Sequence, residues 1–254
     1  MKRHLTAAIA ALLLLNACGK PEIIGPDNTD PAAPGMLLDK IVETTNGTST
    51  VINFEYDLRN GLTSYASEDN RRVAHFDYDE GRLYLVEEMD GRFQVQYFYE
   101  FNNGKPVSAQ YKRWRLDTLN GLLVDDETFT YTLQGDQVTG IRVRNVANGA
   151  QQEYSLSYDD RGELTAIRSV GSNNYEAQFV HGSHRSAYPF ITRWVLDPYG
   201  YSARFHARHE LLSANYDFPG TSMDKFQSNS YTFNPLGYPV TASSGNVQSL
   251  FFYQ

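Results

Sequence analysis

Apolar and polar residues alternate along most of the chain after residue 37, in short runs that end at glycines. In the stretch 157–167, SYDDRGELTAI, one alternating run is followed by Asp-Asp-Arg-Gly and then by a second alternating run. A period of two places successive side chains on opposite faces of a β-strand, and Asp and Gly favour a tight turn between antiparallel strands. The stretch therefore predicts a β-hairpin.

Six further stretches share this pattern of an alternating run, a polar turn with glycine and a restart. They cover residues 54–65, 76–86, 99–109, 131–141, 195–205 and 231–242, and with the first stretch their turn glycines are Gly61, Gly81, Gly104, Gly135, Gly162, Gly200 and Gly237. Hairpins that follow one another in sequence pair with their neighbours, so the pattern predicts an all-β, antiparallel hairpin meander. Its apolar face must be covered, so we expect a strongly curled sheet, a roll or an open barrel.

One segment fits two patterns. RFHARHELLSANY, residues 204–216, is the single helix candidate, yet the overlapping YSARFHARH also alternates. Pro189, Pro198 and Pro219 bracket the region. We predict a strand here and no helix elsewhere.

The motif YD-x-x-G-x-LT, nearly complete at 157–167 and close to complete at 54–65, resembles the YD repeat of RHS-type proteins. Residues 37–254 as a whole resemble a group of secreted, lipid-anchored bacterial proteins of unknown function that are built from such hairpins. The resemblance implies a β-hairpin repeat domain. The chain has too few copies for the hollow shell of large RHS proteins, and any antiparallel meander with glycine turns would show a similar pattern.

The N-terminus carries a targeting signal. Lys2 and Arg3 precede an apolar run from Thr6 to Leu15, which is typical of a secretory signal peptide. Leu15-Asn16-Ala17-Cys18 resembles the lipobox of bacterial lipoproteins, with Asn16 as a less common residue. The resemblance implies removal of residues 1–17 and lipid attachment at Cys18. Gly19 follows the cysteine, and the lipoprotein sorting rule then favours the outer membrane of a Gram-negative bacterium, facing the periplasm or the cell surface.

The composition argues against nucleic acid as a partner and against an internal disulfide. The single cysteine is Cys18, so no internal disulfide can form, and the net charge of -8 gives no electrostatic footprint for nucleic acid. Residues 18–36 contain four prolines and no apolar period, which indicates an extended tether. Residues 37–254 then form the β-hairpin repeat domain, and the membrane partner is reached through the lipid anchor.

The sequence offers few candidates for metal-binding or catalytic residues. His181 and His184, and His206 and His209, form two HxxH pairs. If residues 201–209 form a strand, His206 and His209 point to opposite faces, whereas His181 and His184 lie in a loop-like stretch; no cysteine ligand is available, and we predict no metal site. The acidic pairs Asp125-Asp126 and Asp159-Asp160 are explained by turns and surface charge. No nucleophile elbow or phosphate loop occurs, so we predict neither a cofactor nor catalytic residues.

Aromatic residues near turns offer a binding surface. Trp194, Tyr199 and Tyr201 lie near prolines and can stack on sugar rings or anchor a protein partner; the alternative is that they are core residues. The sequence thus favours a lipid-anchored envelope protein with a non-catalytic binding or structural role and a glycan or envelope protein as partner. The alternative is a carbohydrate-active envelope enzyme or its glycan-binding accessory subunit, which would need two carboxylates across a cleft.

Overall fold

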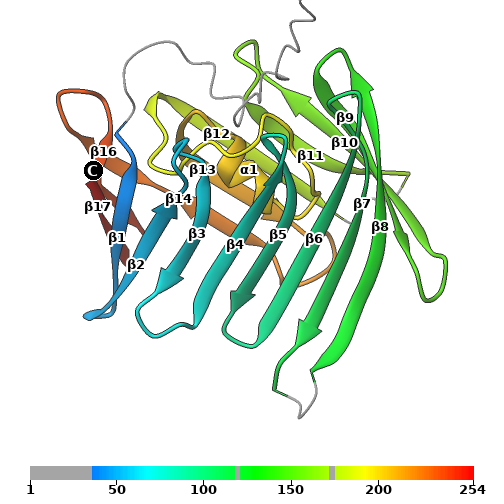
Figure 1. The fold of residues 1–254 in the computed structure, drawn as a ribbon, viewed down its shortest axis with the longest axis horizontal. Coiled ribbons are helices and arrows are strands. Elements are labelled where there is room, and N and C mark those ends of the chain that lie inside the picture. Colours follow the sequence, from blue (N-terminus) through cyan, green and yellow to red (C-terminus); the bar gives the residue numbers. More distant parts are fainter. Residues whose placement is uncertain (1–35, 118–120, 172–174) are drawn as a thin grey trace, which may run out of the picture.

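A computed structural model describes residues 36–117, 121–171 and 175–254 (Figure 1). The predicted signal peptide, Cys18 and the tether up to residue 35 lie outside the described residues. The strands are β1 (Leu38–Thr45), β2 (Thr48–Tyr56), β3 (Leu62–Ser67), β4 (Arg72–Asp79), β5 (Arg82–Asp90), β6 (Phe93–Asn102), β7 (Lys105–Arg115), β8 (Leu122–Gln134), β9 (Gln137–Asn145), β10 (Gln151–Tyr158), β11 (Leu164–Val170), β12 (Glu176–Arg185), β13 (His209–Asp217), β14 (Lys225–Ser228), β15 (Ser230–Phe233), β16 (Pro239–Ser244) and β17 (Val247–Tyr253), and one helix, α1, covers Tyr201–His206.

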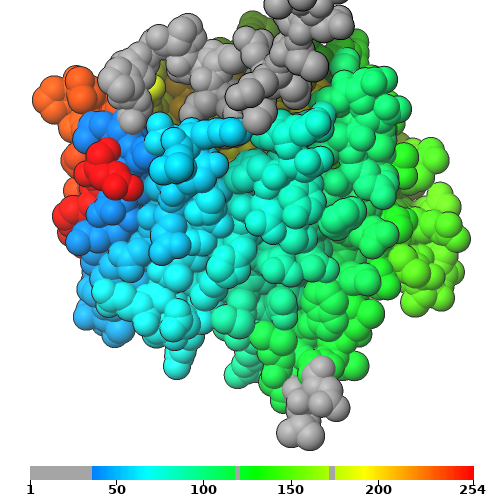
Figure 2. All heavy atoms as spheres, in the orientation of Figure 1, coloured from blue at the N-terminus to red at the C-terminus, as the bar shows by residue number. Residues whose placement is uncertain are grey.

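The strands form one antiparallel sheet that curls into a barrel (Figure 1), and the side chains of its N-terminal half cover the wall that faces the viewer in Figure 2. Each strand from β1 to β13 pairs with the next one in the chain. β14 pairs with β13, and β15, which follows after Asn229, pairs with β16. β16 pairs with β17, and β17 returns to β1. The predicted all-β, sequentially paired and strongly curled sheet is confirmed.

Strand alternation sorts the side chains to the two faces of the sheet. On β8 the rings of Phe129 and Tyr131 are buried inside the barrel, and the intervening Thr130 is exposed. The same holds for Tyr97 and Tyr99 on β6, which enclose the exposed Phe98. Since an alternating strand can bury only one of its faces, the apolar core lies inside the barrel.

The outer face of the barrel carries ion pairs and paired hydroxyl groups. Arg142 on β9 forms an ion pair with Glu153 on β10 at 2.6 Å, and Arg168 on β11 forms one with Glu176 on β12 at 2.9 Å. Elsewhere on this face hydroxyl groups pair across strands, as Thr232 and Thr241 do at 2.7 Å. A barrel that crosses a bilayer needs an outward apolar band, and charged side chains there are costly. The outward ion pairs lie on β9 to β12, and exposed apolar side chains, among them Phe98 and Phe226, lie elsewhere on the outer face.

Aspartate and glycine shape the hairpin turns in the way the sequence predicts. The Asp159 carboxylate accepts backbone N–H groups of Arg161 and Glu163, both at 2.9 Å, and Gly162 adopts a φ of 81°. Asp57 and Asn234 accept backbone N–H groups of their own turns in the same way. Six of the seven turn glycines lie between paired strands; Gly200 does not.

Tyrosines near the ends of four strands link neighbouring hairpins. The hydroxyl groups of four of them donate to a main-chain carbonyl of the adjacent hairpin: Tyr56 to Leu38 at 2.9 Å, Tyr78 to Leu62 at 2.9 Å, Tyr158 to Val138 at 2.7 Å and Tyr253 to Pro239 at 2.7 Å. We call these four the bridging tyrosines. Neighbouring hairpins fan apart near their tips, and each bridge closes the gap with one hydrogen bond. The bridge explains why the repeated pattern has a tyrosine at the end of the first strand of a hairpin.

The predicted hairpin at 195–205 and the predicted strand at 204–216 are corrected by the structure. The chain from residue 186 to residue 208 leaves the sheet, and only residues from His209 onward form a strand. Gly200, with a φ of 86°, precedes α1, and the buried Asp197 accepts N–H groups of the first helical turn. Burial inside the barrel, where backbone groups need internal partners, favours the short helix over an extended strand. No helix in the described residues is long and apolar enough to cross a membrane.

Candidate functional site

The chain between β12 and β13 inserts into the barrel, and we call residues 186–208 the inserted segment. Figure 1 shows α1 inside the curve of the sheet. Val195, Leu196 and Phe205 of this segment are fully buried. The Tyr131 hydroxyl on β8 donates to the Leu196 carbonyl at 2.7 Å. The Phe205 ring packs edge-on against Phe76 on β4, with centroids 5.5 Å apart. The segment therefore supplies much of the core.

A buried carboxylate shapes the segment. Asp197 is fully buried and accepts the backbone N–H groups of Tyr199 at 2.9 Å, Tyr201 at 3.1 Å and Ser202 at 2.6 Å. The Ser202 hydroxyl oxygen in turn accepts the N–H of Leu196 at 2.9 Å. Burial raises the pKa of Asp197, and these hydrogen bonds oppose the shift. The loop before α1 is thus fixed by one acidic side chain.

Histidines and two buried glutamates anchor the ends of the segment. Glu210 accepts the backbone N–H of His184 at 2.7 Å, and its other oxygen lies 3.3 Å from His184 Nδ1. Glu163 lies 2.8 Å from His209 Nδ1, and His206 Nε2 lies 3.2 Å from a main-chain carbonyl. The HxxH pairs are therefore drawn into separate structural contacts. The described residues hold no group of three or more His, Cys, Asp or Glu side chains able to bind a metal ion.

A row of rings runs along the inner wall beside the segment. Tyr199 lies 5.4 Å from Tyr111, Tyr111 lies 5.0 Å from Tyr97, and Tyr97 lies 5.7 Å from Tyr201, measured between ring centroids. Tyr97 and Tyr111 belong to β6 and β7, whereas Tyr199 and Tyr201 belong to the inserted segment. A polar group from the wall or from α1 lies at each end of this row.

At one end, the Tyr199 hydroxyl donates to the Glu127 carboxylate on β8 at 2.5 Å. Tyr199 is 41% exposed, although its ring contacts the inner wall, so solvent reaches the inner face here. Burial raises the pKa of Glu127, and the Tyr199 hydrogen bond opposes the shift. This end combines an exposed ring with a fixed hydrogen-bond acceptor.

At the other end, the Arg204 guanidinium lies among aromatic rings. Its central carbon is 4.6 Å from the ring centroid of Phe205, 5.2 Å from Tyr188 and 5.5 Å from Tyr201. Arg204 also lies 3.9 Å from the Glu88 carboxylate on β5, and 39% of its side chain is exposed. Burial raises the pKa of Glu88, and Arg204 opposes the shift. The guanidinium is thus held in place by stacking and remains within reach of solvent.

We call Glu88, Glu127, Tyr199, Tyr201 and Arg204 the inner cluster. Of the three aromatic residues predicted to bind a ligand, Tyr199 and Tyr201 belong to it. Trp194 is only 4% exposed and packs as a core residue. The partly exposed Tyr199 beside the Glu127 carboxylate is an arrangement that can hold a ligand with hydroxyl groups and an apolar face.

Sequence reasoning missed Glu88, Glu127 and Arg204. A signal existed for Glu127, which lies two residues before Phe129 and four before Tyr131 on an alternating strand. A period of two puts all three on the inner face, where an acidic residue stands out. Arg204 gave no such signal, because its position depends on the helix that the inserted segment forms.

Comparisons with known proteins reveal the fold. No protein-family model and no curated protein matches the chain. A solved porin-like protein from Bacteroides uniformis is similar over 87% of this chain and 99% of its own, with a TM-score of 0.52 and 13% identity. A porin-like protein from Bacteroides vulgatus gives a TM-score of 0.53 and 12% identity over the same shares. The chain therefore has the barrel fold of these porin-like proteins.

Proposed function

We propose that this protein is a lipid-anchored protein of the bacterial envelope that binds a glycan, without cleaving it, at the inner cluster. The observation that carries the proposal is Tyr199, a residue 41% exposed at the inner face whose hydroxyl is fixed by Glu127. A ring held rigid in advance loses little conformational entropy when a sugar stacks on it. The adjacent carboxylate supplies an acceptor for sugar hydroxyl groups.

Two observations favour binding over other roles for this fold. The ion pairs on the outer face, such as Arg142 with Glu153, suit a barrel surrounded by water rather than by lipid. Hydrolysis needs two carboxyl groups that converge on one bond. Glu88 and Glu127 instead lie at opposite ends of the row of rings, and each already accepts a tyrosine hydroxyl.

The binding site is tested by titrating the full chain with defined oligosaccharides of four to six sugars, one at a time, in a calorimeter. We expect Tyr199→Ala to weaken binding about tenfold, because an aromatic contact contributes about 0.5–1.5 kcal/mol beyond its buried area. Tyr199→Phe, which keeps the ring but loses the hydrogen bond to Glu127, should weaken binding less than Tyr199→Ala does. Absence of heat with every oligosaccharide, or release of shorter sugars during the titration, contradicts the proposal.

The lipid anchor and the envelope location rest on the lipobox-like residues 15–18 and on Gly19. The porin-like neighbours come from Bacteroides, which is consistent with an envelope protein. We expect Cys18→Ala to move the protein from the membrane fraction to the soluble fraction, since the acyl chains provide the anchoring. Fractionation followed by immunoblotting measures this. A variant that stays with the membrane contradicts the proposed anchor.

A further inference from the structure

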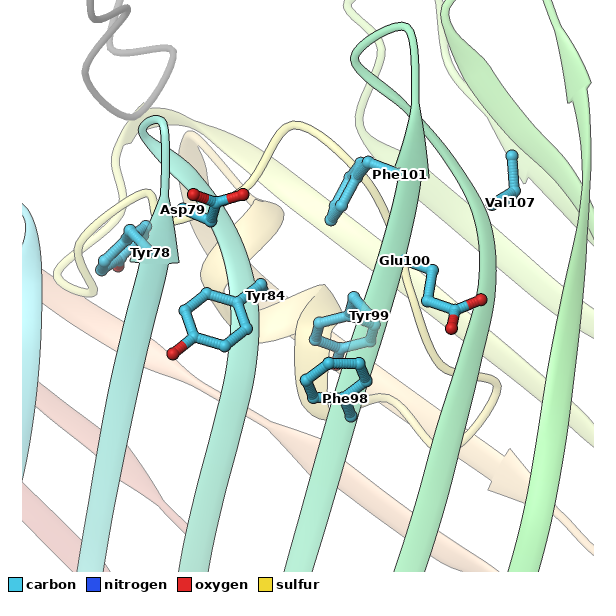
Figure 3. A pocket seen from close by; sticks show the side chains of 8 residues that line it. All are labelled: Tyr78, Asp79, Tyr84, Phe98, Tyr99, Glu100, Phe101 and Val107. Carbon is cyan, nitrogen blue, oxygen red and sulfur yellow. The ribbon is translucent and has the colours of Figure 1, made fainter.

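A groove lies on the outer face between the β4–β5 and β6–β7 hairpins, far along the chain from the inserted segment (Figure 3). Its volume is about 660 Å³, within the range of small-ligand sites. Eight residues line it: Tyr78, Asp79, Tyr84, Phe98, Tyr99, Glu100, Phe101 and Val107. Phe98 and Val107 are 41% and 39% exposed. Figure 3 shows the rings of Tyr84 and Phe98 side by side in front of their strands.

The groove opens where two hairpins separate. The pairing of β5 with β6 reaches no further toward the hairpin tips than Leu85 and Phe98. Beyond that pair, β5 stays paired with β4, and β6 stays paired with β7 as far as Asn102. The two hairpin tips therefore diverge from a shared base, and the groove occupies the space between them.

A substitution in the repeated pattern keeps the groove open. In the β6–β7 hairpin, Phe101 occupies the position of a bridging tyrosine. Phe101 pairs with Pro106 on β7, just as Tyr78 on β4 pairs with Leu83 on β5. In the preceding hairpin the Tyr78 hydroxyl reaches the Leu62 carbonyl. Phe101 has no hydroxyl and cannot make the equivalent bond across the gap to Leu83.

The turn between β4 and β5 is short, and the Asp79 carboxylate beside the groove makes no hydrogen bond to it. In longer turns of other hairpins, the carboxylates of Asp57 and Asp159 accept hydrogen bonds from backbone N–H groups. The β4–β5 turn has only Glu80 and Gly81, with φ values of 49° and 79°. Among the described residues the Asp79 carboxylate has no hydrogen-bond or ion-pair partner, and it is exposed beside the groove.

The charge of the groove is negative. Asp79 and Glu100 are acidic, and none of the other six lining residues is basic. The nearest cations at the hairpin tips are already paired, Arg82 with Glu80 and Lys105 with Asp136. Two carboxylates beside exposed aromatic rings favour a cation, because ring faces and carboxylates both attract positive charge.

We propose that this groove binds an arginine or lysine side chain of a partner polypeptide. The guanidinium or ammonium group pairs with the Asp79 carboxylate, and its aliphatic stem packs on Phe98 and Tyr84. Glu100, whose carboxylate accepts the Ser108 hydroxyl on β7, adds negative charge beside the groove. This site is separate from the inner cluster and does not depend on the glycan-binding proposal. It makes the outer wall of the barrel a docking surface for a basic segment of another protein.

The test titrates the full chain with the peptide acetyl-Gly-Arg-Gly-Arg-Gly-amide in low salt. The control peptide replaces arginine with citrulline, which has nearly the same shape but no charge. We expect the arginine peptide to bind and the citrulline peptide to bind at least about tenfold more weakly. Asp79→Asn should weaken binding about threefold, as the loss of an exposed ion pair does, and Glu100→Gln should weaken it less. Asp160→Asn, at an exposed turn of another hairpin, should leave binding unchanged.

Phe101→Tyr provides a second test that does not remove charge. Its hydroxyl is placed to bridge to Leu83, so we expect weaker peptide binding and a Tm higher by about 2–4 °C, the shift expected from one hydrogen bond of about 1 kcal/mol in a protein of this size. Tyr199→Ala should leave peptide binding unchanged, which separates this site from the inner cluster. Equal binding of both peptides, no binding of either, or displacement of the arginine peptide by a neutral tetrasaccharide would overturn the proposal.

Discussion

Replacing Phe205 with alanine is expected to lower the free energy of unfolding by about 3–5 kcal/mol, because it removes a fully buried ring from the centre of the barrel. The ring contacts Phe76 and Tyr65 on the wall and Tyr188 and Tyr201 within the inserted segment. The two wall residues cannot collapse freely into the space, since strand pairing holds them in place. Urea unfolding followed by circular dichroism measures the loss.

Phe226→Ala is the matched control for this change. Phe226 is also a phenylalanine, but it lies on the outer face of β14 and is 70% exposed. Its removal should change the free energy of unfolding by no more than about 0.5 kcal/mol. Equal effects of the two substitutions would mean that the inserted segment does not pack inside the barrel.

Replacing Asp197 with alanine is expected to cost about 3–5 kcal/mol, because buried hydrogen-bond donors are left without their acceptor at about 1–3 kcal/mol each. In this case the backbone N–H groups of Tyr199, Tyr201 and Ser202 lose their acceptor inside the barrel. Each buried donor left without a partner carries a desolvation penalty. The loop before α1 should then loosen, and Tyr199 with it, so sugar binding should weaken along with stability.

Asp197→Asn separates the hydrogen bonds from the charge. The amide keeps one acceptor oxygen and avoids the cost of a buried charge, so we expect a smaller loss of stability than for alanine. Asp160→Ala, at an exposed turn, should stay within about 0.5 kcal/mol of the unchanged protein. An alanine at position 197 that unfolds at the same urea concentration as the unchanged protein contradicts the role given to Asp197.

The sheet was predictable because hairpins are local. The seven turn patterns and the alternation between them involve residues close in sequence, and six of the seven lie at hairpins. The pairing of β17 with β1 joins the two ends of the described chain, and no local pattern encodes it. Closure follows from the need to cover apolar and unpaired edges, which predicts a curled sheet but not its partner strands.

The site was predictable only in part because it depends on the inserted segment. Tyr201, Ala203 and Phe205 alternate as in a strand, yet they lie on a six-residue helix. Asp197 and Gly200 impose this conformation once the segment is buried, so tertiary contacts override the local pattern. Glu127 was within reach of sequence reasoning, because its phase matches the buried Phe129. Arg204 could not be predicted from the sequence, because its neighbours lie on strands far from it in the chain and in the inserted segment.

The most direct test of this account is native-state hydrogen exchange, read by mass spectrometry, on the full chain. The central claim is that the inserted segment is a folded part of the barrel interior that fixes the inner cluster. We predict that the amides of Leu196, Tyr201 and Ser202, which are hydrogen-bonded inside the barrel, exchange as slowly as those in β7 and β8. Exchange of these amides within seconds, with the strands still protected, would contradict it.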